Sequence, residues 1–313
     1  MKGLELCERF YREYGEPMLK EQFPDLLPYI ATGLFGSGSE CYGYDDELST
    51  DHDFEPGFCI FLPSEDVVDR RNAFLLERAY AKLPKEFEGV KRASVAPVGG
   101  ARHGVIRTGE FFLEKAGTQD GTLSISQWLS TPSYALSEAV NGKVFFDGYG
   151  EVTKIRSLLG QYPEDIRRKK LAGHLLLMAQ AGQYNYLRCL KHGEPAAAQM
   201  AAFEFVKSLI ETVFLLNGVY QPYYKWSFRA MRELPKLSLL AETAEYLIST
   251  DNGEELAETK YMMIEDAASD VIDELQKQEL TKAICGDLEK NAYSVNDGIK
   301  DAEIRNLHIL SAV

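Results

Sequence analysis

The chain has 313 residues, of which 45% are hydrophobic, so it is long enough to bury substantial cores and to form two domains. Its formal net charge of −14 counts against a duplex or a long RNA as the main partner, because such binding depends on Lys and Arg neutralising phosphates. The acidic balance fits a small nucleotide or a cationic acceptor, which an acidic surface attracts by electrostatic steering.

The cysteines and the first residues indicate the compartment. Five cysteines are scattered without a C-x-x-C pair, which is typical of reduced thiols rather than of disulfides or a zinc site. Charges at Lys2 and Glu5 come too early for a signal peptide, and no apolar run is long enough to span a membrane. We therefore expect a cytoplasmic protein with no membrane partner.

The first element expected after the N-terminal helix is a short strand that ends in a turn of small residues. Residues 29–35 are apolar and β-leaning, and predict a strand that stops at Gly36. Gly36, Ser37 and Ser39 allow the backbone to approach a charged ligand closely, and the two hydroxyls add donors. Because backbone N–H groups in such a turn point at an anion, the turn is a candidate phosphate-binding site.

Two carboxylates accompany the next apolar run. Asp51 and Asp53 precede residues 58–62, and successive side chains of a strand alternate faces, so the two carboxylates are expected to point the same way. Two carboxylates on one face can hold one or two Mg²⁺ ions. Such ions bridge the oxygens of a nucleoside triphosphate and neutralise charge that develops in an in-line displacement.

A Gly-Ser turn followed at this spacing by Asp-x-Asp is similar to the signature of the nucleotidyltransferase fold. DNA polymerase beta, the aminoglycoside nucleotidyltransferases and the minimal nucleotidyltransferases share that fold. The longer string over residues 36–54 resembles an uncharacterised bacterial group, a domain of unknown function in which a nucleotidyltransferase-like domain precedes a helical region. The resemblance continues through residues 123–129, 144–148 and 222–226, and so covers most of the chain. It implies transfer of a nucleoside monophosphate from a nucleoside triphosphate to a hydroxyl of a small-molecule acceptor.

Active members of this fold usually supply a third carboxylate from a later strand. Residues 104–113 are β-leaning and predict a strand on which Glu110 is the best-placed acid, with Glu114 on the same face if the strand continues. Glu110 is a candidate for that third carboxylate or for the base that deprotonates the acceptor hydroxyl, and a surface position at a strand end is the alternative. Residues 45–47 offer further carboxylates, either as caps of a helix or turn or as aids to a metal.

The remaining pattern predicts an α+β protein with two domains. Helices are expected at residues 4–23, ended by Pro24, at 64–83 with Ser64 as N-cap, at 126–129, 133–140, 165–190, 196–216, 237–249 and 254–279. Further strands are expected at 90–98 and 143–148. Residues 1–150 thus form a nucleotidyltransferase-like mixed sheet flanked by helices, and residues 151–313 form an all-α bundle.

The helical half contains one segment with chemical interest. Residues 220–229 gather aromatic side chains around Lys225, which could reach a triphosphate while an aromatic ring stacks on a base or sugar; a packing hub between the domains is the alternative. His174 lies on an apolar helix face and is expected to be a core histidine with its polar atoms satisfied.

These patterns support three hypotheses. The first is a Mg²⁺-dependent nucleotidyltransferase with its substrate in a cleft between the domains. The second is a catalytically inactive nucleotide-binding or regulatory protein, such as one member of a toxin and antitoxin pair, in which no third acid reaches Asp51 and Asp53. The third is an aminoglycoside-type antibiotic nucleotidyltransferase, which an acidic pocket in the second domain would favour and an apolar one would count against.

Overall fold

The chain divides into two compact units. The computed structural model describes residues 2–46, 55–92 and 103–313. Unit 1 comprises residues 1–123 and 135–160, and unit 2 comprises residues 124–134 and 161–313. The expected boundary at residue 150 therefore falls inside unit 1, and a short segment from the first half of the chain belongs to unit 2.

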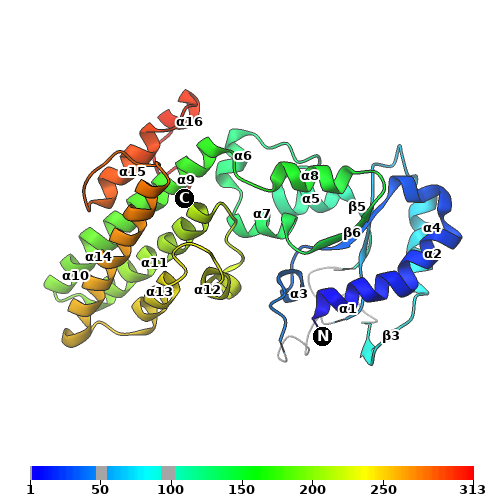
Figure 1. Cartoon of the computed structure of the whole chain (residues 1–313), viewed down its shortest axis with the longest axis horizontal. Helices are drawn as coiled ribbons and strands as arrows, with labels where there is room; N and C mark the ends of the chain where they lie inside the picture. Colours follow the sequence, from blue (N-terminus) through cyan, green and yellow to red (C-terminus); the bar gives the residue numbers. More distant parts are fainter. Residues whose placement is uncertain (1, 47–54, 93–102) are drawn as a thin grey trace. The chain divides into compact units, whose positions relative to one another are not determined.

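Unit 1 is built on a four-stranded mixed sheet with the strand order β5-β2-β1-β6 (Figure 1). Its strands are β1 (Ala31–Leu34), β2 (Cys59–Leu62), β5 (Gly104–Arg107) and β6 (Lys143–Asp147). Strand β1 pairs antiparallel with β2 and β6, whereas β2 and β5 are parallel. The predicted strands around residues 29–35, 58–62 and 143–148 are confirmed, and so is the α+β class.

Helices accompany the sheet in unit 1. They are α1 (Gly3–Phe10), α2 (Glu16–Gln22), α3 (Ser39–Tyr42), α4 (Arg70–Ala81), α5 (Thr108–Ala116), α7 (Ser133–Val140) and α8 (Glu151–Leu159). A π-helical turn, Tyr11–Gly15, joins α1 to α2, and a 3₁₀ turn begins at Pro24, which confirms the predicted helix over residues 4–23. A separate hairpin consists of β3 (Glu86–Phe87) and β4 (Val90–Lys91).

The two central strands are buried on both faces, as expected for a sheet between helical layers. Ile60 of β2 belongs to a cluster that contains Phe10 of α1. On the opposite face Phe61 stacks on Phe35, with ring centroids 4.6 Å apart, and meets Phe111 of α5 edge-on. Burial of each such side chain stabilises the fold by about 1.5–3 kcal/mol.

The strand predicted over residues 104–113 is wrong in its second half. The strand β5 stops at Arg107, and α5 begins at Thr108. Phe111, Phe112 and Ala116 are buried while Leu113 and Glu114 are exposed, which is a helical period rather than the alternation of a strand. Gly117, with φ of +72°, ends the helix in the left-handed conformation that glycine adopts freely.

The helix predicted from Ser64 begins later, at Arg70. Asp69 is its N-cap, and the Asp69 carboxylate accepts a hydrogen bond from the Asn72 N–H at 2.8 Å. The segment before it forms a turn, because the Arg107 guanidinium donates to the carbonyls of Pro63 and Val68, each at 2.7 Å. A long-range contact from β5 therefore overrides the local helix-start signal at Ser64.

Unit 2 is helical, and Figure 1 shows its long helices side by side. Its elements are α6 (Ile125–Ser130), α9 (Glu164–Met178), a π-helix (Ala179–Tyr186), α10 (Leu187–Lys191), α11 (Pro195–Asn217), α12 (Tyr224–Arg232), α13 (Leu240–Ser249), α14 (Glu254–Lys277), α15 (Leu288–Asp297) and α16 (Ala302–Asn306). All six helices expected in residues 126–140 and 165–279 are confirmed, and α15 and α16 add to them. Within the described part of the chain, no helix has the length and apolar character needed to cross a membrane.

Two buried lysines of α9 anchor the C-terminal segment. The Lys169 ammonium donates to the carbonyl of Leu307 at 2.6 Å, and the Lys170 ammonium donates to those of Leu129 and Ala312 at 2.9 and 3.4 Å. Burial lowers the pKa of Lys170 to about 8. The bonds to Leu307 and Leu129 satisfy carbonyls at the ends of α16 and α6 that would otherwise lack a partner within their helices.

His174, also on α9, makes unit 2 sensitive to acid. His174 is partly buried rather than a core residue, and among the described residues its Nδ1 atom has no hydrogen-bond partner, so the expected core histidine with satisfied polar atoms is not found. Burial, with Lys170 nearby, lowers the pKa of His174 to about 3. In the unfolded chain the His174 imidazole is protonated below about pH 6.5, whereas in the folded chain it stays neutral until the pH nears 3. The free energy of unfolding therefore falls as the pH drops from about 6.5 toward 3.

We expect His174→Gln to remove this acid sensitivity. Between pH 7 and pH 4 the wild-type protein should lose about 3 kcal/mol of unfolding free energy that the variant keeps. Urea unfolding of both proteins over that range measures the difference, with His192→Gln at an exposed position as the control. Parallel pH profiles for wild type and His174→Gln would contradict the assignment.

Candidate functional site

The small-residue turn after β1 has a fixed, unusual backbone. Gly36 and Gly38 have φ of +120° and +123°, which a residue with a Cβ rarely adopts. The side-chain amide of Asn141 holds the turn from both sides. Its Oδ1 accepts from the Gly36 N–H at 2.8 Å, and its Nδ2 donates to the Gly36 carbonyl at 2.9 Å. The backbone of the turn is therefore set by the end of α7, more than a hundred residues away in the chain.

Arg156 of α8 stabilises the residues on either side of this contact between Asn141 and Gly36. Its guanidinium donates to the carbonyls of Val140 and Asn141 at 2.8 Å, and lies 4.5 Å from the centre of the Phe35 ring. Burial lowers the pKa of Arg156 to about 10, so it remains charged at neutral pH. Arg156 thus fixes both the end of α7 and the residue that precedes Gly36, which is the kind of support a binding turn needs to keep its shape.

Three side chains meet in front of this turn. The Lys115 ammonium of α5 donates to Ser37 Oγ at 2.7 Å and to Glu138 Oε2 of α7 at 2.9 Å. Ser37 Oγ also donates to Glu138 Oε2, at 2.8 Å. Lys115 and Glu138 are largely buried, with 17% and 15% of their side chains exposed, whereas Ser37 is exposed. A hydroxyl and an ammonium at a glycine turn are the donors that a phosphate group accepts from.

The structure describes some of the predicted site residues and not others. Gly36 and Ser37 form the turn, and Ser39 begins α3 directly after it. Asp51 and Asp53, the predicted metal pair, lie outside the described residues. Within the described residues, no three His, Cys, Asp or Glu side chains gather as a metal site.

Glu110 lies in a different element from the expected strand, whereas Lys225 lies beside an aromatic ring of its own segment, as expected. Glu110 is exposed in the first turn of α5 and not on a strand, and Glu114 follows it one helical turn later. From this helix it is Lys115 that reaches Ser37. Lys225 lies on α12 in unit 2, exposed, with its ammonium 4.8 Å from the centre of the Trp226 ring.

Asp45 takes the capping role that was one of its two expected roles. The buried Asp45 carboxylate accepts a hydrogen bond from the Gly3 N–H at 2.8 Å, at the start of α1. A carboxylate at this place satisfies an unpaired N–H and suits the positive end of the helix dipole.

The sequence does not predict the side chains that hydrogen-bond to the turn or place charges beside it. Lys115 and Glu138 lie 78 and 101 residues beyond Ser37, and Asn141 lies 105 residues beyond Gly36. None of them belongs to a motif with the Gly-Ser turn, and each sits in an ordinary helical pattern. Only the folded arrangement of α5 and α7 brings them together.

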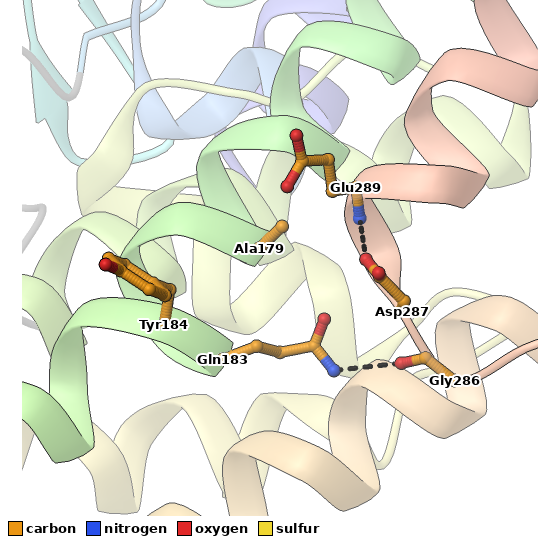
Figure 2. A pocket seen from close by; sticks show the side chains of 6 residues that line it. All are labelled: Ala179, Gln183, Tyr184, Gly286, Asp287 and Glu289. Carbon is orange, nitrogen blue, oxygen red and sulfur yellow. Dashed lines mark hydrogen bonds between the residues drawn. The ribbon is translucent and has the colours of Figure 1, made fainter.

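A second concave region lies in unit 2 and is shown in Figure 2. It has a volume of about 370 Å³ and is lined by Ala179, Gln183, Tyr184, Gly286, Asp287 and Glu289. The lining is mixed polar and apolar, and its polar groups are engaged internally: Gln183 donates to the Gly286 carbonyl, and Asp287 caps α15 by accepting from the Glu289 N–H, both at 2.9 Å. It is therefore the weaker candidate of the two.

The chain is similar to a family model and to a solved structure. The model of a family described as Domain of unknown function (DUF4037) matches residues 128–227, a stretch that includes Glu138, Asn141 and Arg156. No curated protein matches the chain. Among solved structures, it is similar to a nucleotidyltransferase-like protein from Exiguobacterium sibiricum 255-15, with 13% sequence identity and a TM-score of 0.35; the match covers 94% of this chain and 81% of that one.

Proposed function

We propose that this protein is a metal-dependent nucleotidyltransferase that binds the triphosphate of a nucleoside triphosphate at the turn of residues 36–39. The observation that carries the proposal is the contact of Ser37 Oγ with the Lys115 ammonium at 2.7 Å, in front of a backbone held by two glycines of positive φ. The resemblance of residues 36–54 to the nucleotidyltransferase signature supports the same reading.

Each residue of the turn has a role in this proposal. The Gly36 N–H is bonded to Asn141, while the missing side chain of Gly38 lets the backbone approach a phosphate oxygen, and Ser37 adds a hydroxyl donor. Lys115 supplies a positive charge in a surrounding from which water is partly excluded, where an ion pair is stronger than in open solvent. On binding, Ser37 and Lys115 exchange the Glu138 carboxylate for a phosphate oxygen.

Asp51 and Asp53 would hold Mg²⁺ in this proposal, because carboxylate oxygens are the ligands this cation prefers. When bound, the ions neutralise charge on the triphosphate. Glu110 is the proposed base for the acceptor hydroxyl; it is exposed on the first turn of α5, the helix that carries Lys115. The nucleoside monophosphate passes to that hydroxyl and pyrophosphate leaves.

Isothermal titration with each of the four nucleoside triphosphates in Mg²⁺ tests the binding step. We expect saturable binding that inorganic tripolyphosphate displaces, since the contacts of the turn are made to phosphates and not to a base. Absence of binding for all four nucleotides and for tripolyphosphate would refute the proposed site.

We expect Glu138→Gln to bind tripolyphosphate several-fold more tightly than the wild type. The carboxylate competes with phosphate for Lys115 and repels it, whereas the amide keeps the shape of the side chain without the charge. Titration calorimetry of the two proteins at one ionic strength measures the change, and Glu151→Gln in α8 is the control. Weaker binding by Glu138→Gln would mean that Glu138 assists phosphate instead of competing with it.

The pocket in unit 2 is consistent with one alternative kind of acceptor. The pocket of unit 2 has polar and apolar lining in similar measure, and its two carboxylates, Asp287 and Glu289, are the groups that a cationic acceptor of the aminoglycoside type would meet. The regulatory alternative shares nucleotide binding but predicts no release of pyrophosphate with any acceptor.

A further inference from the structure

Three tyrosines of unit 2 form an exposed aromatic surface, here called the tyrosine face: Tyr134, Tyr223 and Tyr224. Their exposed fractions are 41%, 43% and 70%. The rings touch each other, with centroids 5.6 Å apart between Tyr134 and Tyr223 and 4.4 Å apart between Tyr223 and Tyr224. Contiguous exposed rings of this kind mark binding surfaces more often than single exposed residues do.

Hydrogen bonds hold the backbone under the tyrosine face. Ser227, which is buried, donates its hydroxyl to the Pro222 carbonyl at 3.1 Å, and Gln221 donates to the same hydroxyl at 2.9 Å. Met231 is buried one turn further along α12. The rings are thus presented from a fixed helix start, and a ligand that stacks on them meets a surface already ordered.

The Lys225 cation is next to the tyrosine face. The helix α12 carries Lys225, Arg229 and Arg232 and has no Asp or Glu within its bounds, but Arg232 is paired with Glu245 of α13. Lys225 is exposed and follows Tyr224 directly. Aromatic rings next to a cation suit a planar ligand that carries negative charge.

The tyrosine face has an area that suits a small ligand and is too small for a protein partner. With about 200 Å² per aromatic side chain, the exposed fractions amount to roughly 300 Å². A specific protein interface needs about 800 Å² on each side. A single nucleobase, in contrast, needs only one or two rings to stack on.

We propose that the tyrosine face binds the base of a nucleotide, with Lys225 meeting the negative charge of that ligand. This inference rests on the proposed function in that it takes the ligand to be a nucleotide. It concerns unit 2 alone, and its probe differs from the one that tests the turn of residues 36–39 in unit 1.

The test compares ATP, AMP and tripolyphosphate by titration calorimetry. In the variant Tyr223→Ala/Tyr224→Ala, ATP and AMP should bind about tenfold more weakly or worse, while tripolyphosphate binding is unchanged. Tyr224→Phe, which keeps the ring, should bind ATP as the wild type does. Tyr293→Ala removes an exposed tyrosine elsewhere in unit 2 and is the control.

The outcomes distinguish the two assignments. If tripolyphosphate binds and Lys115→Met weakens it, but the tyrosine variant binds ATP and AMP like the wild type, the tyrosine face is refuted and the turn stands. If AMP binding depends on the tyrosines and tripolyphosphate does not bind at all, the turn is refuted and the tyrosine face stands. A change of molar mass in the tyrosine variant, measured by light scattering, would overturn the proposal in favour of contact between two copies of the chain.

Discussion

Lys115→Met should weaken tripolyphosphate and nucleoside triphosphate binding by roughly 10- to 100-fold. A charge-assisted hydrogen bond contributes about 1.5–3 kcal/mol, and each 1.4 kcal/mol corresponds to a factor of ten in affinity. The ammonium is 2.7 Å from Ser37 Oγ and largely buried, so little solvent screening reduces its contribution. Titration calorimetry of the two proteins gives the ratio directly.

Two further variants separate charge from folding. Lys154→Met removes an exposed lysine of α8 in the same unit and should leave affinity unchanged. Lys115→Arg keeps the charge but not the compact ammonium, and should recover part of the binding. If Lys115→Met binds tripolyphosphate normally and its melting temperature is that of the wild type, the phosphate site does not include this lysine.

Asp51→Asn/Asp53→Asn should lower Mg²⁺-dependent turnover by about 10³-fold or more. Metal ions stabilise the charge that develops in the transition state by several kcal/mol, and an amide neither carries the charge nor binds Mg²⁺ as a carboxylate does. Binding of tripolyphosphate without Mg²⁺ should be unaffected, because Gly36, Ser37 and Lys115 remain in place. The measurement is the Mg²⁺ dependence of pyrophosphate release in the variant and the wild type.

Two results would contradict the prediction for the double variant. Pyrophosphate release that persists in the double variant with its Mg²⁺ dependence intact would show that the metal is held elsewhere. Loss of tripolyphosphate binding without Mg²⁺ would show instead that the two carboxylates support the shape of the site.

The local pattern of the sequence predicts much of the fold. The apolar runs before Gly36 and at residues 58–62 are strands because both faces of the central sheet are buried, and periodicity places the long helices of unit 2 correctly. The sequence also predicts the turn of residues 36–39, because glycine and serine at the end of an apolar run favour a turn. Each of these signals is contained within a short stretch of chain.

The errors arise where distant contacts decide the local structure. Arg107 holds Pro63 and Val68 in a turn, so the helix starts at Arg70 and not at Ser64. Phe111 packs against Phe61 from a helix, although its neighbours read equally well as a strand. The partners of Ser37 depend on how α5 and α7 pack, and no spacing in the sequence encodes that.

The release of pyrophosphate tests the central claim most directly. The protein is incubated with labelled nucleoside triphosphates, Mg²⁺ and an extract of cell metabolites, beside Asp51→Asn/Asp53→Asn. The account predicts pyrophosphate release together with a labelled nucleoside monophosphate attached to one acceptor, in the wild type only. Tight nucleotide binding with no pyrophosphate released from any of the four nucleotides would contradict it and identify a nucleotide-binding protein without transfer activity.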